Sequence, residues 1–492
     1  MRFDVVVVGS GPNGLAAAIT LASHGLRVRV LESADQPGGG LASEELTRSG
    51  FIHDVCSSVH PLGIGSPLFR ALPLENFGLE WVHPSIPVAH PLDAHPTPVL
   101  ERSIENTVDR LGPDGSSYQQ LYEPLAEDWD RSIVELLSPI RPNILALPAV
   151  RWAWPGLASA HYAASAFVGE RARALFAGLA AHSMIPLEHA PSAAIALVLG
   201  AAGHAVGWPM PRGGAGELAA ALVRLLEAMG GDVVCGTSVR SLLDVPPARA
   251  TILDLTPKPA LDLIGTPLSV GYRKRLAKYQ YGPGVFKLDW ALSNPIPWRD
   301  PVCARAGTVH VGGSFDEVAR SERSTFFGKH PDQPFVLVTQ PSLFDDSRAP
   351  FGQHTAWAYC HVPAGSQRDM SYAIERQIER FAPGFRDCII ERSTLSSMDL
   401  ESRNPNLVGG DVGAGVLNLR RLLLPMITPR TPYETSLADV FLCSAATPPG
   451  AGVHGMCGFH AARSVLRRRF HLTIPRDPAH ALGPNLRLGN KD

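Results

Sequence analysis

Three glycines near the N-terminus, Gly9, Gly11 and Gly14, follow an apolar run at residues 5–8 in the spacing G-x-G-x-x-G. This pattern can bind a pyrophosphate. The first glycine makes a tight turn, the second lets the backbone approach the phosphates, and the third allows a helix to pack closely on the strand. The unpaired N–H groups at the start of that helix then face the phosphates. The residues predicted to form this loop are Gly9, Gly11, Pro12, Asn13 and Gly14.

An acidic residue, Glu32, ends the next apolar run, residues 26–31, which follows a helix-like segment at 15–24. A carboxylate at this point of a βαβ unit can accept hydrogen bonds from both ribose hydroxyls of an adenosine, and it would repel a 2′-phosphate. Because strand, helix, second strand and acid are all in place, the predicted ligand is FAD or NAD and not NADP.

A second glycine cluster distinguishes FAD from NAD. Ser33 follows the acid directly, and Gly38, Gly39 and Gly40 come a few residues later, just before Leu41. A nicotinamide dehydrogenase does not need its backbone to come so close to the ligand again, whereas a domain that holds an extended FAD does. The cluster therefore predicts FAD as the cofactor.

The spacing E-x5-G-G from Glu32 to Gly39, followed by the runs at 43–45 and 50–54, resembles that of the phytoene desaturase-like flavoproteins. The resemblance extends over nearly the whole chain. It implies an α/β fold in which a Rossmann-like FAD-binding domain of the glutathione-reductase type carries a discontinuous α+β substrate or cap domain. The implied FAD domain is 1–75, 206–265 and 405–475, the implied cap is 76–205 and 266–404, and the tail is 476–492.

The same resemblance implies that two later segments return to the cofactor. A glycine turn at 211–216 follows the first part of the cap, and it would bring Val239 against the adenine end of FAD. Near the C-terminus, Gly452, Val453 and His454 precede a helix and would meet the flavin ring. The dipole of that helix favours an electron-rich flavin.

The chain departs from the resembled family at one place. Many relatives carry an acidic residue just after the last strand of the FAD domain, where it binds the flavin phosphate or ribityl chain. Here the segment reads Cys443-Ser444-Ala445-Ala446. The hydroxyl of Ser444 is a weaker substitute, so the departure puts the affinity for FAD in question.

Three further polar residues have both a functional and a structural interpretation. His60 lies in a segment that returns beneath the flavin in the resembled fold, but a histidine beside a proline also suits an ordinary loop. Arg212 could orient a flavin carbonyl or a substrate, or it could simply cap a loop. His454 could balance the charge of reduced flavin, or it could fill a loop. The sequence identifies no catalytic side chain.

Composition excludes several classes of protein. The formal net charge of the 492 residues is −2, so no basic stripe for nucleic acid is expected. The seven cysteines are scattered and form no C-x-x-C pair, which predicts neither a metal site nor a disulfide framework. Asp4 and the early glycines interrupt any signal-peptide pattern, and we expect a cytoplasmic protein. The oligomeric state cannot be read from the sequence.

A peripheral membrane contact is the one reservation about solubility. Residues 190–211 contain no Asp, Glu, Lys or Arg, and two tryptophans lie within 151–155. Prolines and glycines argue against a membrane span there, and a buried Ala-rich helix is favoured over an element that dips into a membrane.

The functional prediction is transfer of a hydride from a C–H bond of an apolar substrate, such as a carotenoid or another isoprenoid, to N5 of FAD. Two alternatives stay open. One is an FAD oxidase or dehydrogenase that acts on a polar amine or alcohol. The other is a flavin-binding interaction protein without turnover. Charged groups converging on the flavin would favour the polar substrate, and a long apolar tunnel opening near Trp152 would favour the isoprenoid.

Overall fold

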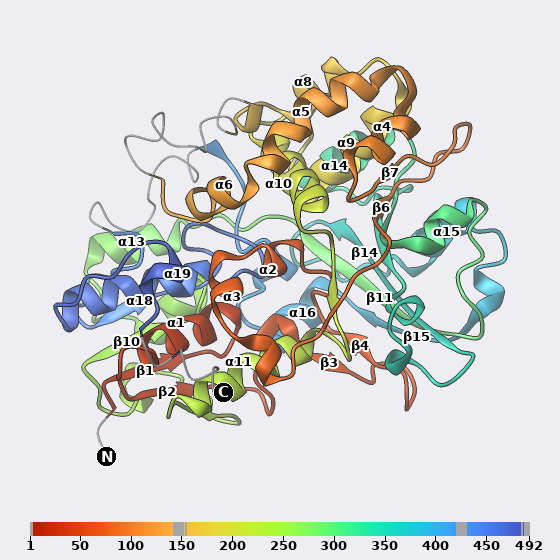
Figure 1. Cartoon of the computed structure of the whole chain (residues 1–492). Helices are drawn as coiled ribbons and strands as arrows, with labels where there is room; N and C mark the ends of the chain where they lie inside the picture. The colour runs from red at the N-terminus through yellow and green to blue at the C-terminus, as the bar shows by residue number, and fades with distance from the viewer. Residues whose placement is uncertain (1–2, 141–151, 153–154, 420–430, 484–485, 487–492) are drawn as a thin grey trace, which may run out of the picture.

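The computed structural model describes residues 3–140, 152, 155–419, 431–483 and 486. Two β-sheets organise these residues, a parallel sheet at the N-terminal side and a larger mixed sheet beside it, with a layer of helices over the mixed sheet (Figure 1). The predicted fold class is confirmed, because a parallel Rossmann-like sheet is joined to a separate α+β unit.

The parallel sheet has five strands in the order β16-β10-β1-β2-β9. They are β1 (Val5–Val8), β2 (Val28–Leu31), β9 (Asp232–Val234), β10 (Ala250–Leu253) and β16 (Val440–Leu442). All four residues of β1 are valines and all are buried, as expected for a central strand covered on both faces. The sheet therefore has its most apolar strand at its centre.

Three helices pack beside this sheet: α1 (Pro12–Ala22), α11 (Ala215–Ala228) and α18 (Met456–Arg469). Helix α1 begins with Pro12 at its first position, where a missing N–H costs nothing. Helices α1 and α18 approach so closely that a Cβ at Gly458 would lie 1.8 Å from the carbonyl oxygen of Asn13. Their contact places the C-terminal helix next to the start of the glycine loop.

The mixed sheet has seven strands in the order β15-β11-β14-β13-β12-β6-β7. They are β6 (Ile86–Ala89), β7 (Val99–Leu100), β11 (Gly284–Leu292), β12 (Ala306–Val311), β13 (Val336–Thr339), β14 (His354–Val362) and β15 (Ile389–Leu395). The predicted antiparallel pairing holds for β11, β13 and β14, but β12 pairs with β6 in parallel.

Alternation along these strands separates two faces. On β11, Phe286, Leu288 and Trp290 join a buried core, and on β14 Ala356 and Ala358 belong to the same core. This face packs against α15 (Ser371–Phe381). The residues between them on each strand point to the opposite face, because side chains alternate along a strand.

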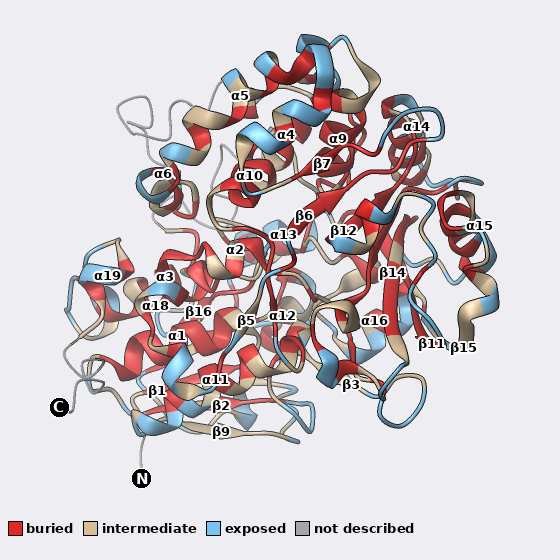
Figure 2. Cartoon of the chain, turned by 45° about the vertical axis from the view of Figure 1, so that its right-hand side comes forward, coloured by how far each residue is buried: buried red, intermediate tan, exposed pale blue. Residues whose placement is uncertain are grey.

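Helices form the outer layer of the cap, and Figure 2 shows their exposed outer and buried inner faces. They include α4 (Ile104–Leu111), α5 (Gly115–Glu127), α6 (Trp129–Leu136), α8 (Ala160–Ala163), α9 (Glu170–Ala181), α10 (Ser192–Ala205) and α14 (Phe315–Phe326). The predicted helix at 118–137 is two helices, which meet at Asp128.

Short elements complete the chain. The helices are α2 (Pro61–Ile64), α3 (Pro67–Ala71), α12 (Pro257–Ile264), α13 (Val270–Ala277), α16 (Ser397–Arg403) and α19 (Pro478–Ala481). Strand β3 (Ser43–Glu44) pairs with β4 (His53–Asp54), and β5 (Trp81–Val82) pairs with β8 (Met210–Pro211). The strand predicted at 79–84 thus lies outside both large sheets.

The charge-free segment 190–211 forms the helix α10, which packs against α5 and α9. Trp152 is buried and its ring lies 6.2 Å from that of Trp129; residues 151, 153 and 154 fall outside the described residues. Over the described parts of the chain, every helix is too short or too polar to cross a membrane. The predicted peripheral membrane contact stays a prediction.

The strands of each sheet come from separate parts of the chain. Strands β1 and β2 lie within 1–75, β9 and β10 within 206–265, and β16 within 405–475. The strands of the mixed sheet lie within 76–205 and 266–404. The parallel sheet is therefore built from three segments that the cap interrupts twice.

Candidate functional site

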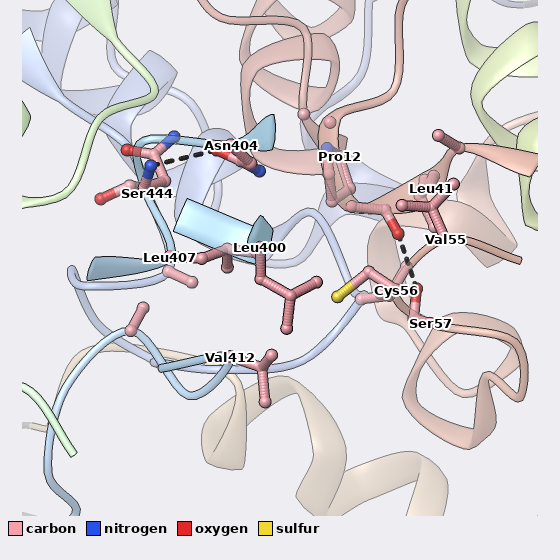
Figure 3. A pocket seen from close by; sticks show the side chains of 18 of the residues that line it. Pro12, Leu41, Val55, Cys56, Ser57, Leu400, Asn404, Leu407, Val412 and Ser444 are labelled. Carbon is pink, nitrogen blue, oxygen red and sulfur yellow. Dashed lines mark hydrogen bonds between the residues drawn. The ribbon is translucent and has the colours of Figure 1, made fainter. Parts of the chain in front are cut away.

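A cavity of about 1160 Å³ is lined by both units of the fold. Its walls include the glycine loop after β1, the segment 31–42, the ends of β10 and β16, and the inner face of the mixed sheet. In the part shown in Figure 3, the sulfur of Cys56 points towards Leu400, and Ser444 lies farther along the wall. The site is thus one continuous space with a dinucleotide-loop end and a cap end.

The glycine loop occupies the position that a pyrophosphate-binding loop requires. Gly9 has a φ of +98°, which favours glycine. A Cβ at Gly11 would lie 2.6 Å from Oδ2 of Asp254, and a Cβ at Gly14 would lie 2.1 Å from the carbonyl oxygen of Gly9. Gly9, Gly11, Pro12 and Asn13 line the cavity, whereas Gly14 lies behind it where helix and strand meet.

Glu32 lines the cavity and is held in place by its neighbours. Its Oε2 accepts hydrogen bonds from the N–H and the hydroxyl of Ser10 at 2.9 and 2.6 Å. Its Oε1 accepts from the N–H of Ala34 at 2.9 Å and from the hydroxyl of Ser33 at 3.2 Å. Four donors to one carboxylate fix its orientation at the end of β2, beside the cavity.

The second glycine cluster packs directly on the first. A Cβ at Gly39, where φ is +57°, would lie 3.3 Å from Cα of Gly11. The N–H of Gly38 donates to the hydroxyl of Ser10 at 3.1 Å, but Gly38 does not line the cavity. The cavity is lined here by Ser33, Gly39, Gly40 and Leu41. The two glycine segments therefore act as one wall.

The later predicted residues divide between the cavity and the core. Val239, Ser444, Gly452 and Val453 line the cavity. The hydroxyl of Ser444 is buried and has no hydrogen-bond partner among the described residues. It is therefore available to a ligand at the position where the resembled family carries an acid.

His454 is buried and does not line the cavity. Its Nδ1 accepts a hydrogen bond of 3.0 Å from the N–H of Met456 at the start of α18. Burial lowers the pKa of this histidine to about 4, so the ring is neutral at pH 7. Its position favours the structural interpretation over a role as charge partner of the flavin.

Asp254, which the sequence analysis did not select, lies at the centre of the loop end. It follows β10 directly, lines the cavity, and accepts a 2.9 Å hydrogen bond from the N–H of Gly14. Burial raises the pKa of its carboxyl to about 7. Asn406 holds the same corner, because its Nδ2 donates to the carbonyl of Asp254 at 2.9 Å. An acid at the end of an apolar strand was the available signal.

The cap end of the cavity is the second face of the mixed sheet. Alternate residues of four strands line it, and they are Val285, Lys287, Thr308, Leu337, Thr339, Trp357 and Tyr359. The rings of Trp357 and Tyr359 stack with centroids 5.6 Å apart. The alternation that the sequence showed thus separates a sheet core from a cavity wall.

Two buried ion pairs support this wall. The ammonium group of Lys287 pairs with Asp289, and Nη2 of Arg348 donates to Oδ2 of Asp54 at 2.7 Å. Burial alone would raise the pKa of Asp54, but the guanidinium of Arg348 holds it at about 2. Burial raises the pKa of Asp289 to about 6, although Lys287 opposes this shift. The formal charges of the two pairs cancel.

Two histidines also line the cap end. Both ring nitrogens of His60 are buried without a partner among the described residues, and burial lowers the pKa of this ring to about 4. Nε2 of His182 lies 3.0 Å from Nε2 of His310, and burial lowers the pKa of His182 to about 3. Both rings are neutral at pH 7 and can offer or receive a hydrogen bond without adding charge.

Two other candidates lie away from the cavity. Nε of Arg212 donates to Oε1 of Glu80 at 2.8 Å, and Arg212 is not among the residues that line the cavity. Trp152 is also absent from the lining and packs on Trp129. The structure therefore places neither an arginine at the flavin end nor a tunnel mouth at Trp152.

Comparisons with known proteins agree with this architecture. Residues 7–72 match the family of NAD(P)-binding Rossmann-like domains. Pyridine nucleotide-disulfide oxidoreductase domain-containing protein 2 of Rattus norvegicus is 24% identical over 560 residues, which cover 95% of this chain and 94% of that protein. The structure of an oxidoreductase from Methanosarcina mazei has the same fold, with a TM-score of 0.64, 16% identity, and coverage of 94% of this chain and 100% of that one.

Two relatives share shorter segments. One limonene dehydrogenase polypeptide, from Castellaniella defragrans, is 33% identical over 125 residues, covering 24% of this chain and 22% of that protein. The flavin-containing amine oxidase B of Sus scrofa is 33% identical over 152 residues, covering 28% and 29%. The narrower resemblance to phytoene desaturase-like proteins stays a prediction.

The residues at the loop end fit FAD. Backbone can approach a pyrophosphate at Gly11 because no side chain fills the space in front of Asp254. Oδ1 of Asn13 and the hydroxyl of Ser444 are buried on the cavity wall without partners among the described residues, so a ligand can satisfy them. With Glu32 at the ribose position and a second glycine wall, FAD is the cofactor that this site accommodates, in a fold shared with flavin-dependent oxidoreductases.

Proposed function

We propose that this protein is an FAD-dependent oxidoreductase that oxidises a C–H bond of a small organic molecule held at the cap end of the cavity. One observation carries the proposal: a single cavity joins the glycine loops to the alternate-residue face of the mixed sheet. A cofactor held at the loop end can therefore meet a substrate held at the cap end. A cavity of about 1160 Å³ exceeds the roughly 300–1,000 Å³ typical of small-molecule sites, which suits two ligands together.

The residues that would hold FAD are those of the loop end. Gly11 and Gly39 offer close backbone approach, Glu32 faces the ribose position, and Ser444 offers a free hydroxyl. When bound, FAD supplies a hydride acceptor, which neither the backbone nor any side chain of the protein provides.

The chain itself contributes position and a dry site. Met184, Leu199 and Leu337 line the cap end together with the stacked rings of Trp357 and Tyr359. Apolar walls exclude water, which protects a reduced intermediate from side reactions. Proton-accepting groups at the wall are weak, because His60 and His182 have low pKa values. Orientation of the substrate is therefore a larger contribution than general-base catalysis.

Two substrate classes have support. The match to limonene dehydrogenase supports an apolar isoprenoid, as the sequence predicts. The match to a flavin-containing amine oxidase supports a polar molecule, as does the presence of Lys287, Thr308 and Thr339 on the cap wall. The absence of Trp152 from the lining removes the expected support for a long apolar tunnel. We favour a compact substrate with both an apolar body and a polar group.

The test is an anaerobic titration of the FAD-loaded protein with limonene-type terpenes, amines and alcohols, followed by the flavin absorbance. Bleaching by one class identifies the enzyme and its substrate class. A protein that takes up no FAD, or whose bound flavin no substrate reduces, would instead support a flavin-binding protein without turnover.

A further inference from the structure

Three polar side chains on the cap wall have unused hydrogen-bonding capacity. Nε1 of Trp357 and Oγ1 of Thr339 are buried and have no partner among the described residues. Lys287, which is 2% exposed, donates one hydrogen bond, to Asp289. All three residues line the cavity. Polar groups in such positions are satisfied in the working protein by water or by a ligand.

The strand register brings these groups together. Trp357 on β14 is paired with Thr339 on β13 and with Asp289 on β11, so these side chains form one row on one face. Lys287 stands two residues along β11, but its ammonium group turns towards this row to reach Asp289. Its Nζ lies 5.5 Å from the centroid of the Trp357 ring. The ammonium, the indole N–H and the hydroxyl therefore occupy neighbouring positions.

The chemistry of the three groups is biased towards donation. An indole N–H and an ammonium group are donors only, and a hydroxyl can donate as well as accept. Their preferred ligand atom is an acceptor. Because Asp289 already balances the charge of Lys287, the cluster does not require a full negative charge from its ligand. A cationic group, by contrast, would find no free acceptor at the cluster except the threonine hydroxyl.

We propose that Lys287, Trp357 and Thr339 form a subsite for a carbonyl-type oxygen of the substrate, either in a neutral C=O group or in a carboxylate. The apolar body of that substrate lies against Tyr359 and Leu337, which line the neighbouring row. This inference rests on the proposed function, and it assigns the substrate class that the cavity selects.

The experiment uses four probes that share one ring: benzamide, benzoate, benzylamine and toluene. Each is titrated into the FAD-loaded protein, and binding is read from the perturbation of the flavin spectrum without any turnover. We expect benzamide, benzoate or both to bind at least about 10-fold more tightly than benzylamine and toluene, since only the first two present an acceptor oxygen to the donors.

Variants then locate the binding. Trp357→Phe and Thr339→Val are each expected to weaken the better oxygen-bearing probe by about 3- to 10-fold, with unchanged binding of toluene and unchanged FAD content. Matched controls are Trp298→Phe, at a half-buried site outside the cavity lining, and Thr394→Val, on the exposed side of β15. Neither control is expected to change probe binding.

The outcomes separate the two proposals. A protein that takes up no FAD contradicts the proposed function. A flavin-loaded protein that binds toluene as tightly as benzamide and benzoate, or whose probe affinities ignore both cavity variants, overturns the subsite alone. Loss of FAD from Trp357→Phe and Thr339→Val would assign these donors to the cofactor, and this result also overturns the subsite.

Discussion

The N–H of Gly14 donates a 2.9 Å hydrogen bond to the carboxylate of Asp254, which lies 240 residues later in the chain. This bond joins the first helix of the parallel sheet to the end of β10, beside the wall where a pyrophosphate would lie. Asp254 therefore sets both the shape and the charge of the loop end. The first two predictions concern this corner.

Gly11→Ala should abolish stable FAD binding. The added Cβ would lie 2.6 Å from Oδ2 of Asp254, so either the carboxylate or the loop must move where the backbone should meet the cofactor. We expect an affinity for FAD at least about 100-fold lower, measured by fluorescence titration of the apoprotein. Gly271→Ala in α13 is the control, because nothing lies within 4 Å of a Cβ there. Equal FAD affinity of the two variants would contradict the proposed loop.

Asp254→Asn should flatten part of the pH dependence of stability. Burial raises the pKa of Asp254 from 3.8 to about 7 in the folded protein. The folded state therefore binds a proton that the unfolded state has released, and the free energy of unfolding falls as pH rises from about 4 to 7. The Asn variant lacks this loss, so it should gain up to about 4 kcal/mol relative to wild type across the window. Urea unfolding of both apoproteins at several pH values measures the difference, and parallel curves would refute the raised pKa.

Ser444→Ala should weaken FAD binding moderately. The Ser444 hydroxyl is buried on the cavity wall without a partner among the described residues, so a bond to the cofactor is the interaction at stake. Removal of one neutral hydrogen bond should lower the FAD affinity by about 3- to 10-fold, as measured by equilibrium dialysis. Ser138→Ala in the cap, where the hydroxyl donates to a backbone carbonyl, should leave that affinity unchanged. An unaltered affinity of Ser444→Ala would show that no such bond forms.

Arg348→Met should destabilise the junction between β4 and the cap. Arg348 and Asp54 are both fully buried, and the variant leaves the Asp54 carboxylate without its partner. Loss of one member of a buried pair costs about 3–5 kcal/mol. Arg70→Met removes an exposed pair with Asp130 and should cost less than about 1 kcal/mol. Denaturant midpoints compare the two, and similar losses would contradict the assigned role of burial.

Local signals in the sequence were sufficient for the first βαβ unit. The run of valines, the glycine spacing and Glu32 all lie within about thirty residues, and each acts on its neighbours. Strand β11 was predicted with its observed ends, residues 284 and 292, because its apolar residues are uninterrupted and turn residues flank it. Alternation also indicated that one face of the mixed sheet could line a pocket.

Contacts between distant segments could not be predicted in the same way. Nothing near Asp254 reveals that it will meet Gly14, since the two come together only when β10 is inserted beside β1. Likewise, alternation does not say which face of β11 is the core, so Lys287 could not be assigned to the cavity. The break at Asp128 was missed because the apolar period continues across it.

The order of the strands has a consequence for how the protein is made. Strand β10 lies between β1 and β16, and β16 begins only at Val440. During synthesis the N-terminal strands leave the ribosome first, yet their sheet lacks its last strand until most of the 492 residues have been translated. Nascent chains must therefore carry an unfinished nucleotide site for nearly the whole of translation, and cofactor loading becomes one of the last events in the birth of the molecule.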